Sequence, residues 1–574
     1  MGKRIVAAIL GTLFVLMCVV GCGKTDQAPK QQAAAEASKR DVTATQGVVA
    51  AAHPLAAQAG LEVLKKGGNA FDAAVATAFT LGVVEPNASG IGGGGFAIVY
   101  VAKEQKSYVI DFREVAPQKG NANFYKRDEK GKILDDALAT GWYSAGVPGE
   151  VAGMDMINKK FGSMKWADLM QPAIKQAEEG LVISQNLSKI TTDEFDRMQK
   201  FPSKAFFEKT FIKDGLPVQA GDKVINKDYA KSLKKIAQGG AEVFYKGELA
   251  DAIAKDYQKN GSGWITKEDL ANYQAVLREP LKSTYRGYTI EVVPPPSSGG
   301  LTVAEILNVL EGFEITKMGA TSADYIHDFI ETQKLAFADR SKYMGDPSFI
   351  EIPSTGLLNK KYAAQERGQI NQQKASDDKV APGNPNPYEA GSTTSFSIID
   401  KEGNMISVTK SINHFYGGGV VPEGTGIMMN DHMEDFDGAL GKINSPEPGK
   451  KPLSSMSPVI VLKDGKPFMT LGSPGGPRII SAVANVLVNI IDFGMDIQAA
   501  IEAPRYHNPN AKTTDIESSV SQEVIKNLEA RGHKFTMKNP LDLFFGGVQG
   551  VMYTPDGKLR GGADPRRDGV AVGY

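Results

Sequence analysis

A polar stretch that ends abruptly in an alternating strand places the strongest constraint on the fold. Residues 371–390 are rich in Pro, Asn, Asp and Gln and show no apolar periodicity, which is typical of an exposed linker. Residues 391–400 follow at once, alternate polar with apolar side chains, and turn back over 405–411. A second hairpin over 459–471 runs into a long apolar helix over 477–491. Strands followed by helices predict a sheet covered by helices, an α/β layered fold.

The first half of the chain predicts alternating helices and short strands. The glycine-rich segment 86–95 follows a helix and enters a strand, which is the reverse of a dinucleotide-binding loop. We interpret it as a tight turn where backbone approaches backbone or substrate. The middle, about 150–370, is richer in amphipathic helical pattern. The elements expected around the turn are helices over 54–66 and 70–84 and strands over 96–101 and 108–112.

Composition excludes several classes of protein. The chain has 574 residues, of which 42% are hydrophobic and 23% charged, as in a soluble globular protein. Its 65 basic and 66 acidic residues leave a net charge of −1, which argues against a nucleic-acid partner. With six histidines and two cysteines, a zinc-rich protein or a disulfide scaffold is excluded.

Both cysteines lie in an N-terminal segment that looks like a bacterial lipoprotein signal. A basic start, Lys3 and Arg4, precedes an apolar run that ends at Gly21-Cys22. Residues 1–21 would be the signal peptide, and Cys22 would become the lipidated first residue of an extracytoplasmic protein anchored to a membrane. Residues 22–46 read as a flexible tether, with the globular body beginning near Gly47. The alternative is an uncleaved anchor helix.

Thr393 stands where the linker meets the strand. If the bond between Ser392 and Thr393 breaks, Thr393 gains a free α-amine that can act as base for its own hydroxyl nucleophile. The reference pKa of an α-amine is about 7.7–8.0, so a useful fraction is neutral near pH 7. No histidine is then needed, which suits a histidine-poor chain. On spacing alone, two ordinary strand threonines, Thr393 and Thr394, remain the open alternative.

Gly475 and Gly476 lie where the second hairpin ends and the long helix begins. Free backbone N–H groups and the positive end of a helix converge at such a junction. An oxyanion hole for a tetrahedral intermediate needs donors of this kind. An ordinary strand-to-helix turn explains the same pattern, and the residues leave both interpretations open.

Several long motifs give the chain a specific resemblance. From about Gly47 to Tyr574 it closely resembles the gamma-glutamyltransferase family (glutathione hydrolases), N-terminal-nucleophile enzymes that cleave themselves into two subunits. The motifs that carry the resemblance are Ala52-His53-Pro54-Leu55-Ala56, Gly67-Gly68-Asn69-Ala70, Glu85-Pro86-Asn87 through Phe96, Asp111-Phe112-Arg113-Glu114, Pro452 through Pro458, and Gly472-Ser473-Pro474-Gly475-Gly476.

The resemblance implies a role for each matching residue. Thr393 is expected to be the nucleophile and the cleavage point, with Ser411 replacing a family threonine beside it. Gly475 and Gly476 are expected to form the oxyanion hole. The γ-glutamyl group would be bound by Arg113, Ser454 and Ser455 at its α-carboxylate, by Asn413 and Asp435 at its α-ammonium, and by His432 and Glu434 in the same set. A guanidinium suits the first task because it forks onto both carboxylate oxygens.

The resemblance also implies an architecture and partners. We expect a four-layer αββα N-terminal-nucleophile hydrolase fold made of two intertwined subunits, 47–392 and 393–574, which form a heterodimer of the two cleavage products. The expected substrates are small γ-glutamyl donors of the glutathione class, with water or an amino acid as acceptor. No cofactor or metal is required.

Three departures from the family pattern bear on donor choice. Ser395 stands where the family often has histidine, and His432 where it commonly has Gln or Glu. A protonated His432 would repel the α-ammonium, whereas a neutral one can accept a hydrogen bond. The segment between Phe436 and Pro452 is short and without aromatics, so we expect no tyrosine lid. An open site would admit larger donors such as poly-γ-glutamate.

Five other interpretations fit parts of the sequence. Ser232-Leu233-Lys234-Lys235 matches Ser-x-x-Lys of penicillin-binding enzymes, but the partner motif Lys-Thr-Gly is missing from the sequence. A metal site around Asp431, His432, Glu434, Asp435 and Asp437 has suitable residue types without metal-loop spacing. A non-catalytic ligand-binding lipoprotein is the alternative of a different class. Within the family, the alternatives are a poly-γ-glutamate depolymerase and a glutaryl-cephalosporin-type acylase.

Overall fold

The computed structural model describes residues 40–376, 379–381 and 392–574, and residues Arg40–Tyr574 form one compact unit. The predicted signal peptide 1–21, the lipidation site Cys22 and most of the predicted tether lie outside the described residues, as does most of the linker 371–390. No helix in the described part of the chain has the length and apolar character needed to cross a bilayer.

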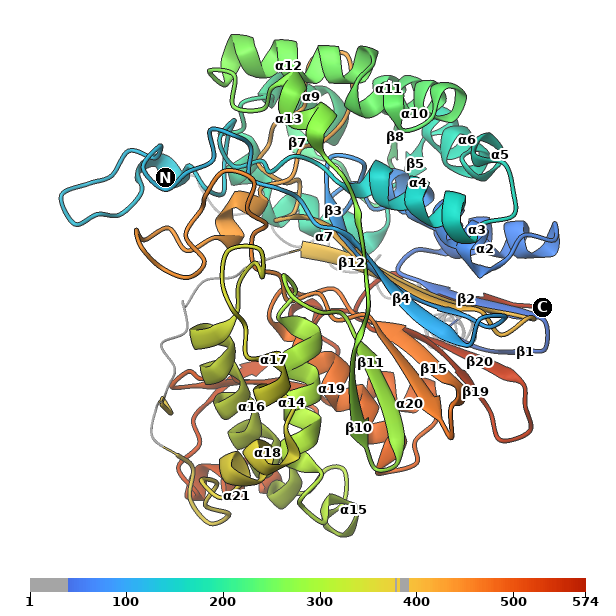
Figure 1. Ribbon diagram of the computed structural model, residues 1–574. Coiled ribbons are helices and arrows are strands. Elements are labelled where there is room, and N and C mark those ends of the chain that lie inside the picture. Colours follow the sequence, from blue (N-terminus) through green and yellow to red (C-terminus); the bar gives the residue numbers. More distant parts are fainter. Residues whose placement is uncertain (1–39, 377–378, 382–391) are drawn as a thin grey trace, which may run out of the picture. The chain divides into compact units, whose positions relative to one another are not determined.

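Two seven-stranded antiparallel sheets form the centre of the unit (Figure 1). We name them after the strands that carry the site. The β12 sheet has the order β21 (Val570–Gly573), β2 (Gly47–Ala51), β12 (Ser392–Asp400), β13 (Met405–Asn413), β3 (Gly94–Val101), β4 (Lys106–Phe112) and β9 (Val276–Arg278). The β15 sheet has the order β1 (Asp41–Ala44), β20 (Leu559–Ala563), β19 (Gln549–Tyr553), β15 (Lys466–Gly472), β14 (Val459–Lys463), β11 (Tyr288–Val292) and β10 (Leu281–Tyr285).

Helices cover the outer face of each sheet, which completes the predicted αββα layering (Figure 1). The β12 sheet carries α2 (Pro54–Lys65), α3 (Ala70–Val84) and α4 (Glu150–Phe161), and the β15 sheet carries α14 (Gly299–Leu310), α16 (Ala323–Tyr343), α19 (Arg478–Ile491) and α20 (Ile497–Glu502). The described helices also include α5 (Trp166–Leu169), α6 (Gln171–Glu179), α7 (Gln185–Asp193), α8 (Phe195–Met198), α9 (Lys204–Phe211), α10 (Lys227–Gly239), α11 (Glu242–Tyr245), α12 (Glu248–Asn260), α13 (Lys267–Asn272), α15 (Ile315–Met318), α17 (Ser354–Leu357), α18 (Lys360–Arg367) and α21 (Gln522–Ala530). Smaller strands are β5 (Leu181–Val182) with β8 (Lys223–Val224), β6 (Ile212–Lys213) with β7 (Leu216–Pro217), and β16 (Tyr506–His507), β17 (Thr514–Glu517) and β18 (Phe535–Lys538).

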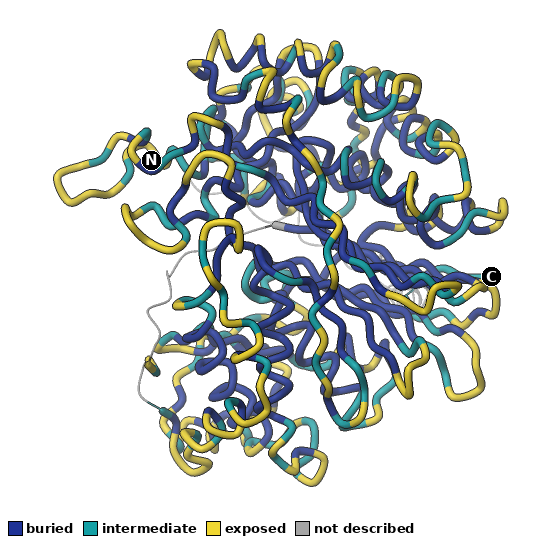
Figure 2. The backbone as a smooth tube through the Cα atoms, viewed as in Figure 1, coloured by how far each residue is buried: buried dark blue, intermediate teal, exposed yellow. Residues whose placement is uncertain are grey.

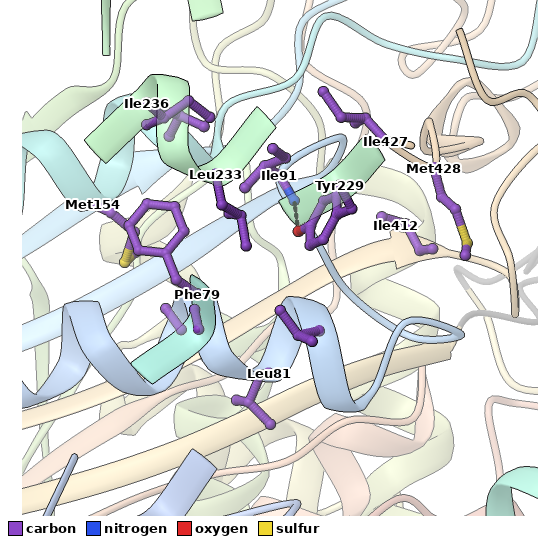
Figure 3. Packing of buried hydrophobic residues seen from close by; sticks show 14 of the residues in the cluster. Phe79, Leu81, Ile91, Met154, Tyr229, Leu233, Ile236, Ile412, Ile427 and Met428 are labelled. Atoms are coloured by element: carbon purple, nitrogen blue, oxygen red, sulfur yellow. Dashed lines mark hydrogen bonds between the residues drawn. The ribbon is translucent and has the colours of Figure 1, made fainter. Parts of the chain in front are cut away.

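Successive side chains of each strand point to opposite faces of its sheet, and both faces are packed against other elements. In β2, Val49 and Ala51 face the α2–α3 core, whereas Val48 and Ala50 face the β15 sheet. Figure 2 shows the central strands of both sheets buried, with exposed residues mainly in the loops and outer helices. Figure 3 shows part of the core above the β12 sheet, where Phe79 of α3 and Leu233 of α10 pack near Tyr229, whose hydroxyl accepts a hydrogen bond from the Ile91 amide (3.4 Å).

Local signals fix the helices that lie over the nucleophile strand. Helix α3 starts with a capping box, in which Asn69 accepts from the Asp72 amide (2.9 Å) and Asp72 accepts from the Asn69 amide (3.1 Å). The Ala70 amide donates to Asp400 at the far end of β12 (2.8 Å). Helix α2 begins with Pro54 at its first position, as the pattern predicts. The predicted helices over 54–66 and 70–84 are therefore confirmed.

Both sheets interleave segments from the two sides of residue 392. In the β12 sheet, β12 lies between β2 and β13, and β13 pairs with β3. In the β15 sheet, β14 pairs with β11, and β20 pairs with β1. Two chains made by a cut at this point would therefore remain joined through the ladders of both sheets.

One expectation from sequence is wrong. The predicted tether to residue 46 includes Asp41–Ala44, which forms strand β1, held by a bidentate Asp41–Arg560 pair (2.8 and 2.6 Å). Four residues are too short to show a strand period. The middle of the chain is rich in helices, as predicted, and also contributes strand β11 and the edge strands β9 and β10. The two edge strands are half exposed, so their sequence lacks a strong apolar alternation.

Candidate functional site

Thr393 lies at an irregularity in the pairing of β12 with β13. The register shifts between Ser392 and Thr394, so one extra residue of β13 bulges opposite Thr393. Such bulges occur next to active sites because they re-aim a side chain. The Thr393 hydroxyl is buried and donates to Ser411 Oγ at 3.5 Å. The predicted proximity of these two hydroxyls is confirmed.

Asn413 extends this contact away from the strand. Its amide donates to Ser411 Oγ (2.7 Å), and its side chain donates to Glu434 Oε2 and to the Asp431 carbonyl, both at 3.2 Å. Its φ of +74° lies in the left-handed region, which asparagine tolerates better than most residues. The end of β13 is therefore tied to the short helix η2 (His432–Asp435).

The glycine-rich turn packs against the same strand end. A Cβ on Gly93 would lie 2.0 Å from the Ser411 carbonyl oxygen, and one on Gly92 would lie 2.0 Å from that of Met428. Only glycine allows these approaches. The interpretation of 86–95 as a turn where backbone meets backbone is confirmed.

The turn after β15 reaches the nucleophile strand from the other sheet. A Cβ on Gly472 would lie 2.6 Å from Ser395 Oγ, so the sheets touch two residues after Thr393. Gly475 and Gly476 follow with φ of +130° and +57° just before α19 begins at Arg478. In the described part of the chain, neither of their amides donates a backbone hydrogen bond. Donors for an oxyanion are thus available at this turn.

Arg113 and Asp435 form the central ion pair of the site. The Arg113 side chain is 1% exposed, and its Nη2 contacts Asp435 Oδ2. The guanidinium also donates to the carbonyls of Pro452 (3.3 Å) and Leu453 (3.1 Å), which brings the segment with Ser454 beside it. The cationic and anionic halves of the expected amino-acid clamp therefore meet directly.

Ser454 and Ser455 are held by residues that precede and follow helix α14. The Ser454 carbonyl accepts from the amide and the hydroxyl of Ser298 (2.8 and 2.7 Å). Arg340 of α16 donates to Ser455 Oγ (2.9 Å) and Ser298 Oγ (2.8 Å). Because a guanidinium only donates, Ser455 Oγ is the acceptor in this contact.

His432 lies against Glu114, not against the ion pair of Arg113 and Asp435. Its Nδ1 is 2.9 Å from Glu114 Oε1, although neither atom makes a well-directed hydrogen bond. Burial, with the charge of Arg113, lowers the pKa of His432 to about 3, so the ring is neutral. Burial raises the pKa of Glu114 to about 7, against the effect of Arg113. Of the two states considered from sequence, the neutral His432 is therefore the one present at neutral pH.

His414 lies between two carboxylates next to Asn413. Its Nδ1 is 2.7 Å from Asp431 Oδ2 and 2.8 Å from Glu434 Oε2. Burial alone would lower the pKa of His414, but Asp431 and Glu434 outweigh it and raise the pKa to about 10. Among the residues considered from sequence as a metal group, His432 lies against Glu114, whereas Asp431 and Glu434 approach His414.

Contacts connect part of the predicted set: Thr393 to Ser411, Ser411 to Asn413, Asn413 to Glu434, and separately Arg113 to Asp435. Sequence reasoning missed Glu114, His414 and Arg340 as members of the site. Glu114 lies within a quoted motif and could have been found there. No spacing rule connects Arg340 to Ser455, because the contact depends on how α16 lies against the loop before β14.

Comparison with known proteins agrees with this geometry. A family model described as gamma-glutamyltranspeptidase matches residues 56–574. Glutathione hydrolase proenzymes from Escherichia coli (strain K12) and Pseudomonas sp. (strain A14) are each 41% identical, over 93% and 94% of this chain and 93% and 96% of their own. A cephalosporin acylase structure from Bacillus halodurans superposes with a TM-score of 0.85 at 33% identity, over 93% of this chain and 97% of its own. The predicted N-terminal-nucleophile hydrolase fold is confirmed.

We expect Glu114→Gln to flatten the dependence of stability on pH. The folded state holds the Glu114 proton more tightly than the unfolded chain, since the pKa is about 7 against 4.5. This stabilisation is complete below the unfolded value and is lost as pH rises to about 7, at most about 3 kcal/mol. Glutamine stays neutral, so the free energy of unfolding should fall less between about pH 5 and 8.

Chemical denaturation at the two pH values measures this difference. The matched control is Glu129→Gln, an exposed glutamate, which should keep the wild-type slope. Parallel pH curves for wild type and Glu114→Gln would contradict the assigned burial effect.

Proposed function

The chain belongs to the gamma-glutamyltranspeptidase family, and from this premise we propose that Thr393 is its nucleophile. The enzyme is a γ-glutamyl hydrolase and transferase that acts on glutathione and related γ-glutamyl compounds. The residue assignment rests on the placement of Thr393 at an irregularity in the pairing of β12 with β13, where its hydroxyl donates to Ser411. The Arg113–Asp435 pair supports it, because Asp435 follows Glu434, the acceptor from Asn413 at the end of β13. Maturation is a cut between Ser392 and Thr393, which yields subunits 47–392 and 393–574.

The reaction follows from these positions. The freed α-amine of Thr393 takes the hydroxyl proton, and Oγ1 attacks the γ-amide carbonyl of the donor. The amides of Gly475 and Gly476 stabilise the oxyanion, the amine leaves with the proton, and a γ-glutamyl ester remains on Thr393. Water then completes hydrolysis, or the amine of an amino acid or peptide completes transfer. Ser411 orients the nucleophile from 3.5 Å.

The Arg113–Asp435 pair would recognise the amino-acid end of the donor. A zwitterion inserted between the two side chains gives its α-carboxylate to Arg113 and its α-ammonium to Asp435, so both protein charges stay paired. Ser454 and Ser455 would donate to the carboxylate. Asn413 and Glu434 would border the ammonium. Neutral His432 would lie behind them as a hydrogen-bond acceptor, in place of the Gln or Glu that the family commonly has at this position.

The loop between Phe436 and Pro452 bears on donor size. It consists of turns, closed by a hydrogen bond from the Asp437 amide to the Asn444 carbonyl (2.7 Å), and carries no aromatic side chain. We propose that the site admits donors larger than glutathione, including poly-γ-glutamate. The acylase relationship favours a second activity, on glutaryl-cephalosporin donors. Assays in which poly-γ-glutamate or a glutaryl-cephalosporin competes with glutathione distinguish these activities.

We also propose that the mature enzyme is extracytoplasmic and anchored to a membrane by lipid on Cys22. The support is the sequence of residues 1–22, with a basic start, an apolar run and Gly21-Cys22. The tether that follows would hold the compact unit away from the bilayer.

We expect wild-type protein to be cut and Thr393→Ala to remain one chain. Removing the hydroxyl removes the nucleophile needed for both autocleavage and turnover. The mass of the denatured protein measures this directly, because a fragment of residues 393–574 that begins Thr-Thr-Ser identifies the cut.

Thr393→Ser is the matched control, since it keeps a hydroxyl and should cleave, more slowly. Uncut wild type after long incubation, or γ-glutamyl turnover by Thr393→Ala, would contradict the assignment. The first result would favour a non-catalytic lipoprotein that binds γ-glutamyl ligands.

We expect Arg113→Lys to raise KM for γ-glutamyl donors with little change in kcat. Lysine keeps the charge but loses the fork that serves both carboxylate oxygens. Loss of one charge-assisted hydrogen bond costs about 1.5–3 kcal/mol, which corresponds to roughly 10- to 150-fold in kcat/KM. Steady-state kinetics with a free-carboxylate donor and its α-amide measure the effect. An equal loss for both donors would contradict carboxylate recognition by Arg113.

We expect Cys22→Ser to release the enzyme from the membrane fraction. Without the thiol there is no diacylglycerol attachment, so the protein should partition into the aqueous phase of a detergent extraction and lack the lipid mass. Cys18→Ser is the control, because that residue would leave with the signal peptide. Retention of Cys22→Ser in the membrane would instead favour an uncleaved anchor helix.

A further inference from the structure

A cluster of three metal-ligating side chains lies at the proposed substrate site, which it shares through Glu434, and none of the three makes or breaks a bond in the proposed reaction. His414 Nδ1, Asp431 Oδ2 and Glu434 Oε2 all lie within 4.8 Å of one another. His414 comes from the loop after β13, and Glu434 comes from η2. The sequence keeps these residues apart, so only the fold brings them together.

Two carboxylate oxygens approach one nitrogen of His414, and a protonated ring has only one shared hydrogen to offer them. The two carboxylate oxygens lie 2.7 and 2.8 Å from the same Nδ1, yet a ring nitrogen carries at most one hydrogen. A divalent ion at the convergence point would serve all three atoms at once. One imidazole nitrogen with two carboxylate oxygens is a ligand set that suits Zn²⁺, Co²⁺ or Mn²⁺.

The surroundings hold these ligands in place. Asp431 Oδ1 accepts from the His414 amide (3.0 Å), and Glu434 Oε2 accepts from Asn413 Nδ2 (3.2 Å). Such contacts orient ligands around a metal. Arg197 lies 3.5 Å from Asp431 Oδ2, but its guanidinium also donates to the carbonyls of Phe415 (2.8 Å) and Gly417 (2.7 Å).

An ion can reach the cluster from solvent. The side chains of His414 and Glu434 are 21% and 23% exposed, whereas Asp431 is fully buried beneath them. Metal–ligand bonds of about 2.0–2.2 Å require the ligand pairs to open by roughly half an ångström. The two partly exposed side chains have the freedom to do so. Asp136 adds a further negative charge near Glu434.

We propose that His414, Asp431 and Glu434 form a binding site for a divalent transition-metal ion, and that the bound ion inhibits the enzyme. On binding, the Nδ1 proton goes to solvent, the lone pair of Nδ1 forms the bond to the ion, and no electron is transferred. Inhibition rests on the proposed function: the ion places positive charge next to Asn413 and Asp435, where the donor's α-ammonium must sit, and draws Glu434 away from Asn413.

Calorimetric titration of the chelator-treated mature enzyme with Zn²⁺ tests binding without reference to activity. We expect one saturable site, and Co²⁺ at the same site should show the absorption of a nitrogen- and oxygen-bound ion. His414→Gln should weaken binding at least about tenfold. The matched control Asp136→Asn removes a nearby charge outside the ligand set and should change affinity less than about twofold.

Each outcome decides a separate part of the proposal. Absence of saturable binding, or unchanged affinity in His414→Gln, overturns the site. If His414→Gln does not fold, the same titration is carried out on Glu434→Gln, and unchanged affinity again overturns the site. Zn²⁺ should raise KM for the γ-glutamyl donor without lowering kcat, and binding without this effect overturns the inhibitory role alone. An enzyme inactive on all γ-glutamyl donors would refute the proposed function and leave the titration to decide the site.

Discussion

The buried ion pair between Arg113 and Asp435 is the interaction on which the geometry of the site depends. Arg113 also lies 3.4 Å from Glu114, so loss of Asp435 would leave the buried guanidinium with less opposing charge, and breaking a buried pair costs several kcal/mol. Through its other donors, Arg113 fixes the carbonyls of Pro452 and Leu453, and with them the serines that follow. Asp435 ends the short helix that also carries Glu434, the acceptor from Asn413. One ion pair therefore sets the distance between three loops that no sheet joins directly.

The two interleaved sheets supply the rigidity that these loops lack. The nucleophile strand β12 has neighbours on both sides, and Ser395 and Ser397 face the β15 sheet at close range, where Gly472 leaves room for the Ser395 hydroxyl. A histidine at position 395 would not fit against Gly472 in this packing. The departure from the family pattern at Ser395 is thus a matter of sheet-to-sheet distance. It does not touch the nucleophile's own contact with Ser411.

Much of the fold can be predicted from sequence where an element is long enough to show its hydrophobic periodicity. The paired strands β12 and β13, the helices α2, α3 and α19, and the glycine turn at 86–95 all carry strong local signals. The short strand β1 and the edge strands β9 and β10 do not, because three to five half-exposed residues show no reliable alternation. The predicted site residues came from the family resemblance, and the structure brings most of them together. His414 and Arg340 were missed because their roles come from tertiary contacts between elements far apart in the chain.

The charge balance of the Arg113–Asp435 pair also bears on which donors the site prefers. A γ-glutamyl donor carries both an α-carboxylate and an α-ammonium, so it separates the pair and gives each side chain a new partner. A glutaryl donor carries only the carboxylate. It would satisfy Arg113 but bring no ammonium to Asp435, and neutral His432 adds no charge there. On the proposed assignment, a donor that carries both charges replaces both halves of the pair, whereas a glutaryl donor replaces only one, so we expect the amino-acid donor to bind more tightly.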